Sequence, residues 1–214
     1  MCIRDRDDTL IVFTADHGEF LGDRGLGEKE LFHDEVMRVP FIVVDPDARA
    51  DATRGTVDQR FVEAVDVVPT CLSALDLPVP AHQVEGRSLL PLLRGEADVP
   101  WRDCAFSELD YGMRRARRVL GRPVDACRAM MVRTREWKYV HWQDMRPQLF
   151  NLESDPLELI DLGAAAGYDT ACATMHARLF DWMAQRRLRV TASDAEVELR
   201  TDAHRRHGID IGIW

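Results

Sequence analysis

The sequence predicts an α/β fold in which a helix-covered sheet is followed by a small antiparallel sheet. Two continuous apolar runs, 9–14 and 40–46, have the β-branched composition of strands buried on both faces, as in a parallel sheet. After Pro100, short runs rich in β-branched or aromatic residues follow one another without intervening helices, which favours antiparallel pairing. A final apolar stripe at helical spacing predicts a helix that packs beside this second sheet.

The composition is that of a globular protein with an acidic charge balance. Hydrophobic residues make up 46% of the 214 positions and charged residues 30%, unlike disordered or membrane-embedded chains. A formal net charge of −9 argues against a nucleic-acid or membrane partner, but it allows a local basic pocket for a small anion. The cysteines lack CxxC spacing, so we expect neither a disulfide framework nor a zinc site, and a cytoplasmic location. They are Cys2, Cys71, Cys104, Cys127 and Cys172.

The two predicted strands of the first half are separated by a long segment, residues 15–39, rich in glycine and charge. A loop of this length inside a compact domain is uncommon and is usually functional. Further along, residues 65–77 indicate a helix with Asp66 as candidate N-cap and Pro69 in its first turn. Residues 86–96 indicate a short helical turn that Gly95 closes.

In the second half, the strand-like runs are "CAFSEL", "RAMMVRT", "WKYVHW" and "PQLFNL". The helical stripe that follows consists of Met175, Leu179, Trp182 and Met183. Between two of the strands, residues 114–123 carry five arginines. Such a run is usually a solvated loop or helix face, and an anion-steering surface is the alternative.

The chemistry of the first half is concentrated directly after the first strand. Asp16 and His17 lie two and three residues past it, at the end of a strand where open α/β sheets bind ligands. A carboxylate and an imidazole together suit a divalent cation, and Gly18 would let the backbone turn tightly beside it. Lys29 could direct a positive charge toward a bound anion.

Each of these residues also has a plainer interpretation. An Asp-His pair after a strand more often forms a hydrogen-bonded turn, and a single lysine such as Lys29 is more often a surface residue. His33 fits a hydrogen-bonded loop histidine as well as a substrate contact. Glu19 and Asp23 could hold the metal ligands in place, or only add negative charge. Spacing alone leaves these alternatives open.

Two longer stretches resemble a known family. The stretch "LIVFTADHGEFLGDRGLGEKELFHDEVMRVPFIVVDP" resembles the metal-binding segment of the sulfatase branch of the alkaline phosphatase superfamily. Downstream, "REWKYVHW" and "LFNLESDPLELIDL" look like strands and turns of its C-terminal subdomain. The resemblance implies the C-terminal part of an alkaline-phosphatase-like sandwich with a small antiparallel α+β subdomain. It divides the chain into core (7–100), subdomain (101–190) and C-terminal arm (191–214).

The resemblance also implies a chemistry. Such enzymes hydrolyse sulfate, phosphate or phosphonate esters at one divalent metal, with a formylglycine nucleophile. Asp16 and His17 align with metal ligands, and Lys29 aligns with a lysine that contacts the substrate and the leaving group. Mn²⁺ or Ca²⁺ is the metal we expect, with Mg²⁺ or Zn²⁺ as alternatives. The substrate would be a small anionic ester, with His33 as a further contact.

The branch of the family is less sharply defined. "DHG" and the "GEKELFHD" run look more like phosphonate monoester hydrolases and related phosphodiesterases, whereas "DRGL" resembles choline sulfatases. Relatives of the first group often have His-Trp where this chain has Arg24 and Gly25. Their C-terminal arm packs between subunits, which implies a homo-oligomer, a dimer or tetramer, and a docked Trp214.

No cysteine in the chain fits the family's C/S-x-P/A-x-R nucleophile motif. The acidic metal ligands of the early strands are also not found. The sequence therefore predicts the C-terminal piece of a longer ester hydrolase that is inactive by itself. A non-catalytic binding or oligomerisation module is the alternative, although it would have no need of Asp16, His17 and Lys29 together.

Overall fold

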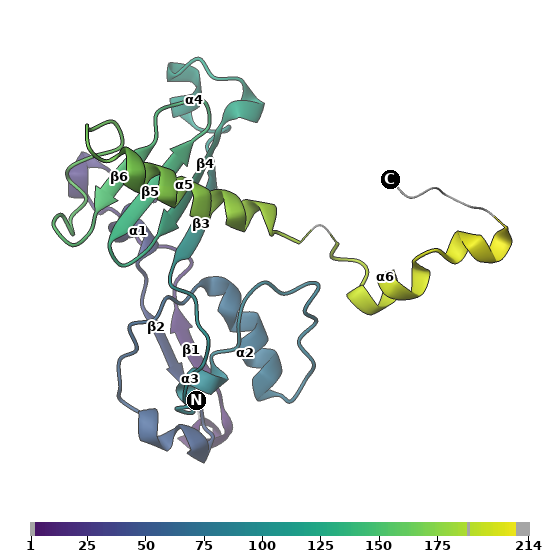
Figure 1. The fold of residues 1–214 in the computed structure, drawn as a ribbon. Helices are drawn as coiled ribbons and strands as arrows, with labels where there is room; N and C mark the ends of the chain where they lie inside the picture. Colours follow the sequence, from purple (N-terminus) through teal and green to yellow (C-terminus); the bar gives the residue numbers. More distant parts are fainter. Residues whose placement is uncertain (1–2, 188, 209–214) are drawn as a thin grey trace.

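The computed structural model describes residues 3–187 and 189–208, which form two separate antiparallel sheets (Figure 1). The first sheet pairs β1 (Ile11–Thr14) with β2 (Phe41–Val44). The second has four strands in chain order, namely β3 (Ala105–Asp110), β4 (Arg128–Arg133), β5 (Trp137–Trp142) and β6 (Gln148–Asn151). The predicted α/β class and the antiparallel second sheet are thus confirmed.

The prediction that the first two strands are parallel and buried on both faces is wrong for the described chain. β1 and β2 run antiparallel, with Thr14 opposite Phe41. Phe13 and Ile42 expose 60% and 57% of their surface. The physical reason for the pairing is that the connection between the strands doubles back on itself, whereas parallel neighbours require a crossover, usually a long helix.

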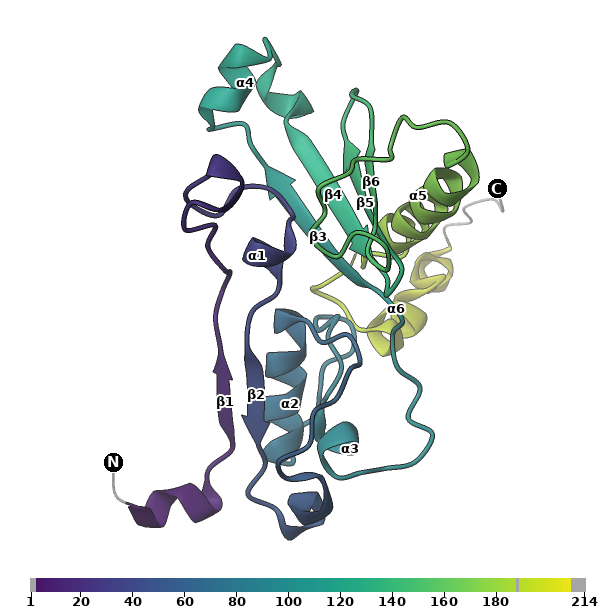
Figure 2. The ribbon, with the colours of Figure 1, turned by 90° about the vertical axis from the view of Figure 1, so that its left-hand side faces the viewer.

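Short helices precede, connect and follow these two strands. They are η1 (Ile3–Asp8), η2 (Asp23–Gly25), α1 (Asp34–Met37), η3 (Ala48–Thr53), η4 (Ala64–Asp66), α2 (Val67–Ala74) and α3 (Leu90–Leu93). Figure 2 shows α2 and α3 to one side of the strand pair. The helix predicted at 65–77 corresponds to η4 and α2, and Pro69 lies in the first turn of α2 as predicted. Gly95 follows α3 with φ of +67°, so it closes that helical turn as predicted.

Asp66 precedes α2, but its side chain does not cap that helix. The buried carboxylate accepts a hydrogen bond from the Arg87 N–H at 2.8 Å, and the Arg102 guanidinium contacts both of its oxygens at 2.5 and 2.6 Å. The position of Asp66 in the sequence suggests a helix cap. In the structure, however, the guanidinium of Arg102, 36 residues later, binds both carboxylate oxygens. Asp66 therefore ties α2 to the segment that enters the second sheet.

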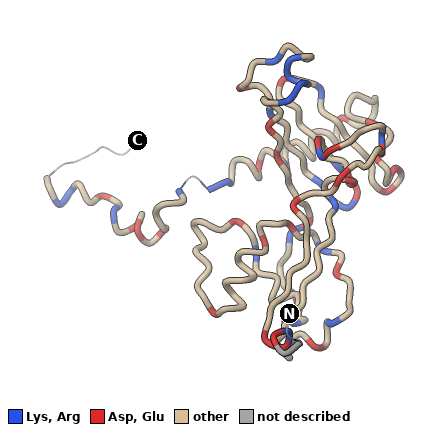
Figure 3. Tube along the Cα trace, turned by 180° about the vertical axis from the view of Figure 1, so that it is seen from behind, with Lys and Arg blue, Asp and Glu red and all other residues tan. Residues whose placement is uncertain are grey.

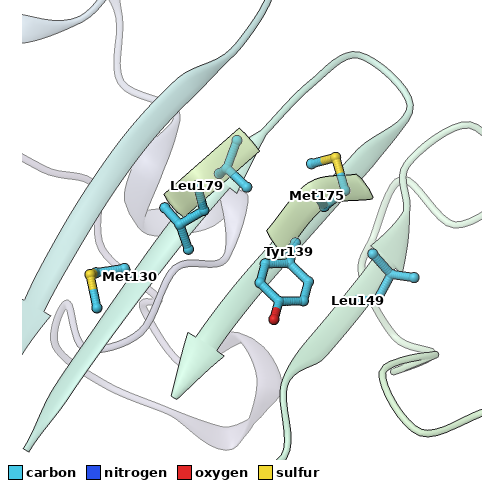
Figure 4. Packing of buried hydrophobic residues seen from close by; sticks show 6 residues of the cluster. Met130, Tyr139, Leu149, Met175 and Leu179 are labelled. Carbon is cyan, nitrogen blue, oxygen red and sulfur yellow. The ribbon is translucent and has the colours of Figure 1, made fainter. Parts of the chain in front are cut away.

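The second sheet is covered on one face by α5 (Asp169–Ala184), as the apolar stripe predicts (Figure 1). Trp182 of the stripe stacks on Phe106 with ring centroids 4.6 Å apart, whereas Met183 remains 39% exposed. Figure 4 shows the packing of the buried cluster between helix and sheet. Its members are Met130, Val132, Tyr139, Leu149, Met175 and Leu179.

The other face of the same sheet is covered by the long loop that follows β1. Phe32 of this loop is buried against Ala129, Met131 and Val140. Because side chains alternate between faces along a strand, Met130 and Val132 of β4 meet α5 while Ala129 and Met131 meet the loop. The continuous apolar run in β4 thus reflects a strand buried on both sides.

The rest of the chain lies at the periphery. α4 (Arg115–Val119) and η5 (Val124–Ala126) lie beyond one end of the second sheet, where Figure 3 shows a concentration of basic residues. α6 (Asp194–Arg200) and η6 (Ala203–His207) form an arm that extends away from both sheets (Figure 1). Trp214 lies outside the described residues. No helix in the described chain has the length and apolar character needed to cross a membrane.

The loop after β1 doubles back through direct backbone contact. The Gly18 N–H donates to the Val36 carbonyl at 2.7 Å, and the Glu19 N–H donates to the Glu35 carbonyl at 3.2 Å. A Cβ atom at Gly18 would lie 2.0 Å from the Glu35 carbonyl oxygen, so only glycine fits here. Close backbone approach, rather than the predicted tight turn, explains this glycine.

A buried ionic network attaches the loop to the second sheet. Lys138 of β5 is 1% exposed; its ammonium contacts Glu158 and donates to Asp34 at 2.6 Å and to the Phe32 carbonyl at 2.9 Å. Glu158, from the turn after β6, accepts from the Asp34 N–H at 3.0 Å. Arg24 of the loop donates to the Glu158 carbonyl at 3.0 Å. We call Arg24, His33, Asp34, Glu35, Arg133, Lys138 and Glu158 the loop-sheet network.

The network also fixes the protonation of its carboxylates. Burial alone would raise the pKa of Asp34, but the charges and hydrogen bonds of Lys138 and Arg133 outweigh it and hold this pKa below its usual value. For Glu158, burial is likewise outweighed by the hydrogen bond from His33 and the charge of Lys138, so its pKa is also lowered. Both carboxylates are therefore ionised at neutral pH.

We predict that Lys138→Met destabilises the fold strongly. The substitution leaves two carboxylates buried without their shared cation, which costs about 3–5 kcal/mol when one partner of a buried pair is removed. Urea unfolding of the 214-residue chain measures this loss. Asp51→Asn, which breaks an exposed pair with Arg54, is the control and should cost about 1 kcal/mol at most. Equal losses for the two variants would contradict the importance of the network.

We also predict a specific acid dependence of stability. Because the pKa of Glu158 is lower in the folded state, its contribution is fully present above the unfolded pKa of about 4.3 and is lost as pH falls through the folded pKa. The unfolding free energy of Glu158→Gln should therefore change less steeply than that of the wild type below about pH 5. Urea unfolding at a series of pH values checks this, and parallel curves would count against the role of Glu158.

Candidate functional site

Asp16, His17 and Lys29 meet at the base of the loop that follows β1. Asp16 and His17 come directly after the strand, and Lys29 comes from the returning half of the loop. Lys29 Nζ lies 2.7 Å from His17 Nε2, and Asp16 Oδ2 lies 3.4 Å from the same nitrogen. The structure therefore brings together three residues that sequence analysis selected, and it places a carboxylate, an imidazole and an ammonium around one point.

The environment of His17 fixes which ring nitrogen is free to bind a ligand. Its Nδ1 lies 2.7 Å from the Gly18 carbonyl oxygen, which can only accept a hydrogen bond. Nδ1 must then carry the proton, which leaves the lone pair on Nε2. A backbone carbonyl that orients the imidazole in this way is a common support for a metal-binding histidine. Because Asp16 Oδ2 lies beside Nε2, this donor pair fits a divalent cation.

Lys29 contributes a positive charge at the same point. Its ammonium donates to His17 Nε2, so it holds the lone pair that a metal ion would use, and an ion could bind there only after the lysine moved aside. The side chain of Asp16 is 85% exposed and that of His17 is 32% exposed, so the group is open to a ligand from solvent. Glu19 and Asp23, considered above as supports, make no side-chain hydrogen bond or ion pair with a described residue. The nearby support is the Gly18 backbone instead.

His33 lies in the loop-sheet network rather than in contact with His17 or Lys29 in the described structure. Its Nδ1 is 3.0 Å from Glu158 Oε2, and its ring lies between Phe20 and Phe150 with centroids 6.1 and 5.6 Å away. The side chain is 14% exposed. The predicted substrate contact of His33 stays a prediction, and only its Nε2 could make it.

His33, Glu35 and Glu158 form a second group of possible metal ligands, with donor atoms within 4.8 Å of one another. This group is already neutralised by protein cations. Arg24 Nε lies 3.1 Å from Glu35, and the Lys138 ammonium contacts Glu158. A divalent ion here would be repelled by both cations at short range. We therefore assign this group to the loop-sheet network; at His17, by contrast, a single exposed ammonium, that of Lys29, would have to move aside for an ion.

Sequence analysis missed the partners in this network. Lys138 and Glu158 stand in "WKY" and "DPLE", two of the segments that carry the family resemblance, but nothing in their spacing pairs them with a loop more than 100 positions earlier. Arg24 and Asp34 were part of the loop without an individual role. A lysine between the aromatic residues of a predicted strand was the available signal, because a buried lysine requires a partner.

Comparison with known proteins gives a consistent family. A family model described as N-sulphoglucosamine sulphohydrolase, C-terminal, matches residues 22–185. The chain is 32% identical over 179 residues to the multifunctional alkaline phosphatase superfamily protein PehA of Trinickia caryophylli, covering 82% of this chain and 34% of that protein. It is 35% identical over 159 residues to choline-sulfatase of Rhizobium meliloti (strain 1021), covering 73% and 27%.

The structure of phosphonate monoester hydrolase of Agrobacterium radiobacter is also similar. It superposes with a TM-score of 0.76 at 36% identity, over 84% of this chain and 36% of that one. The chain thus spans about a third of the length of PehA and of this structure.

These similarities confirm the alkaline-phosphatase-like fold that the sequence predicted. The chain belongs to the N-sulphoglucosamine sulphohydrolase C-terminal family, in the sulfatase branch of the alkaline phosphatase superfamily.

Proposed function

We propose that this chain supplies one side of the active site of a metal-dependent hydrolase that acts on phosphonate monoesters or phosphodiesters. The observation that carries the proposal is the convergence of Lys29 and Asp16 on His17 Nε2. A carboxylate and a neutral imidazole hold a divalent cation, and an ammonium beside them complements an anionic ester. A surface scaffold has no need of all three groups at one point.

The residues have distinct roles in this proposal. Asp16 and His17 would hold Mn²⁺ or Ca²⁺, or alternatively Mg²⁺ or Zn²⁺, and this ion would polarise the ester and stabilise developing negative charge. Lys29 binds a non-bridging oxygen and stabilises charge on the leaving oxygen. The Gly18 carbonyl holds His17 in the tautomer whose Nε2 lone pair can accept, from Lys29 in this structure or from a metal ion once Lys29 has moved to the substrate. His33 would reach the substrate only through its Nε2.

One comparison favours the phosphonate and phosphodiester branch. A similar solved structure, at 36% identity, is that of a phosphonate monoester hydrolase. The 35% identity to a choline-sulfatase supports sulfate ester hydrolysis as the second candidate. Both candidates use the same electrostatics, because a metal ion and an ammonium suit tetrahedral phosphorus and sulfur esters alike.

We propose that the remaining parts of the site lie in a longer polypeptide. The relatives are about three times as long as the matched region, so they have room for the formylglycine nucleophile and for further metal ligands. In this arrangement residues 7–100 complete the core, 101–190 form the subdomain, and the arm at 191–214 contributes to a homo-oligomer. The exposed Phe13 and Ile42 would then be covered by neighbouring parts of the core.

We predict that Asp16→Ala in the full-length gene product abolishes metal-dependent turnover. The substitution removes a charged ligand, so the remaining ligands hold the ion more weakly and away from its catalytic position. Initial rates on a phosphonate monoester, a phosphodiester and a sulfate ester, titrated with Mn²⁺, measure the loss and identify the preferred ester. Asp23→Ala is the matched control and should retain activity. Near-normal turnover of Asp16→Ala at saturating metal would refute the assigned role.

For Lys29→Ala we predict a loss that depends on the leaving group. Esters with poor leaving groups develop more charge on the departing oxygen, so they should lose more in kcat/KM than activated aryl esters. A series of aryl esters that differ in leaving-group pKa measures this dependence. An equal loss along the series would mean that Lys29 binds the substrate but does not assist departure.

A further inference from the structure

The arginine-rich segment 114–119 has no role in the site described above. It comprises Arg114 and the helix α4, beyond one end of the second sheet (Figure 3). Arg117 supports the local backbone by donating to the Gly112 carbonyl at 2.7 Å. By contrast, the exposed side chains of Arg115 and Arg118 make no hydrogen bond or ion pair with any residue that the structure describes.

The local charge arrangement is unfavourable for the fold. Arg114 and Arg118 are four positions apart, and Arg115 and Arg118 are three apart, so like charges face each other on one short helix. Arg114 and Arg115 also lie at the N-terminal end, where the helix dipole disfavours cations. The ion pair with Glu30 offsets this cost for Arg114, but no described residue offsets it for Arg115, which suggests a role in binding.

The same arginines line a hollow large enough for a small ligand. Its volume is about 590 Å³, within the range of small-molecule sites. Four arginine side chains line it, and Asp110 is its one lining carboxylate. That carboxylate already accepts a hydrogen bond from the Gly112 N–H at 2.7 Å. The hollow therefore combines a strong excess of positive charge with guanidinium groups, which bind tetrahedral anions and carboxylates bidentately.

An ion pair connects this hollow to the loop that carries Lys29. Arg114 Nη2 lies 2.6 Å from Glu30 Oε1, and Glu30 directly follows Lys29. The side chain of Lys29 is directed to His17, while that of its neighbour holds Arg114. Two consecutive loop residues thus contact the two groups, Lys29 at His17 and Glu30 at the arginine that lines the hollow.

We propose that Arg115 and Arg118 form a second anion-binding site, which takes a second anionic group of the substrate beyond the ester that is cleaved. This proposal rests on the proposed hydrolase function. The preferred substrates would carry a further phosphate, sulfate or carboxylate group. This group would lie on the part of the substrate that extends past Glu30 toward Arg115 and Arg118. The site adds affinity and selectivity for such doubly anionic esters.

Inorganic pyrophosphate is a suitable probe for the 214-residue chain itself. Titration followed by NMR of ¹⁵N-labelled arginine should give saturable shifts for Arg115 and Arg118. The double variant Arg115→Gln/Arg118→Gln should weaken binding at least about tenfold, because it removes two charge-assisted contacts. Arg187→Gln/Arg206→Gln is the matched control, since it removes the same charge from two exposed arginines on other elements. It should change the affinity less than about twofold.

Three results would overturn the proposal: no saturable binding, equal weakening in both double variants, or shifts centred on arginines outside the segment that contains Arg115 and Arg118. The chain with Lys29→Ala should still bind pyrophosphate at the arginines. Pyrophosphate binding at the arginines and ester turnover are thus tested separately. Binding without turnover would count against the hydrolase function alone, and turnover without binding would count against the anion site alone. In the full-length enzyme, Arg115→Gln/Arg118→Gln should raise KM about tenfold more for a doubly anionic ester than for a singly anionic one. An equal rise for both esters would exclude the substrate role.

Discussion

The contact between Lys138 and Glu158 holds the candidate site to the rest of the molecule. Lys138 belongs to β5 of the second sheet, and both side chains are buried. Through Asp34 and the Phe32 carbonyl, the same ammonium reaches the loop after β1. A buried ion pair is retained at a high desolvation cost, so its geometry has to be well defined. Because the Lys138 ammonium also binds the loop, this geometry also positions the loop that carries Asp16, His17 and Lys29.

This arrangement separates the charged groups into two functions. In the loop-sheet network, carboxylates and cations balance one another and are shielded from water, so the network holds structure and has no capacity for a further ion. At the base of the loop, Asp16, His17 and Lys29 are partly open to solvent, which is what the proposed metal and anion binding requires. Anchoring the loop through buried pairs keeps the open group in place before a ligand binds, which lowers the cost of binding.

Much of the fold could be predicted from local sequence patterns. Apolar runs, the helical stripe around Leu179 and the glycine after α3 all act over a few residues, so spacing reveals them. The convergence of Lys29 on His17 was expected from family resemblance, because no local pattern fixes a contact across twelve positions. The antiparallel pairing of β1 and β2 and the partners of Asp66 and Lys138 depend on contacts between distant segments. Such contacts leave no periodic signal in a single sequence.

The position of a bound metal ion tests the account most directly, because the structure contains two groups of possible ligands. Crystals of the full-length gene product grown with Mn²⁺ would show the ion by its anomalous scattering. We predict a peak between the Asp16 carboxylate and His17 Nε2, with the loop-sheet network free of metal. A peak among His33, Glu35 and Glu158 would contradict both the assignment of the site and the structural role of the network.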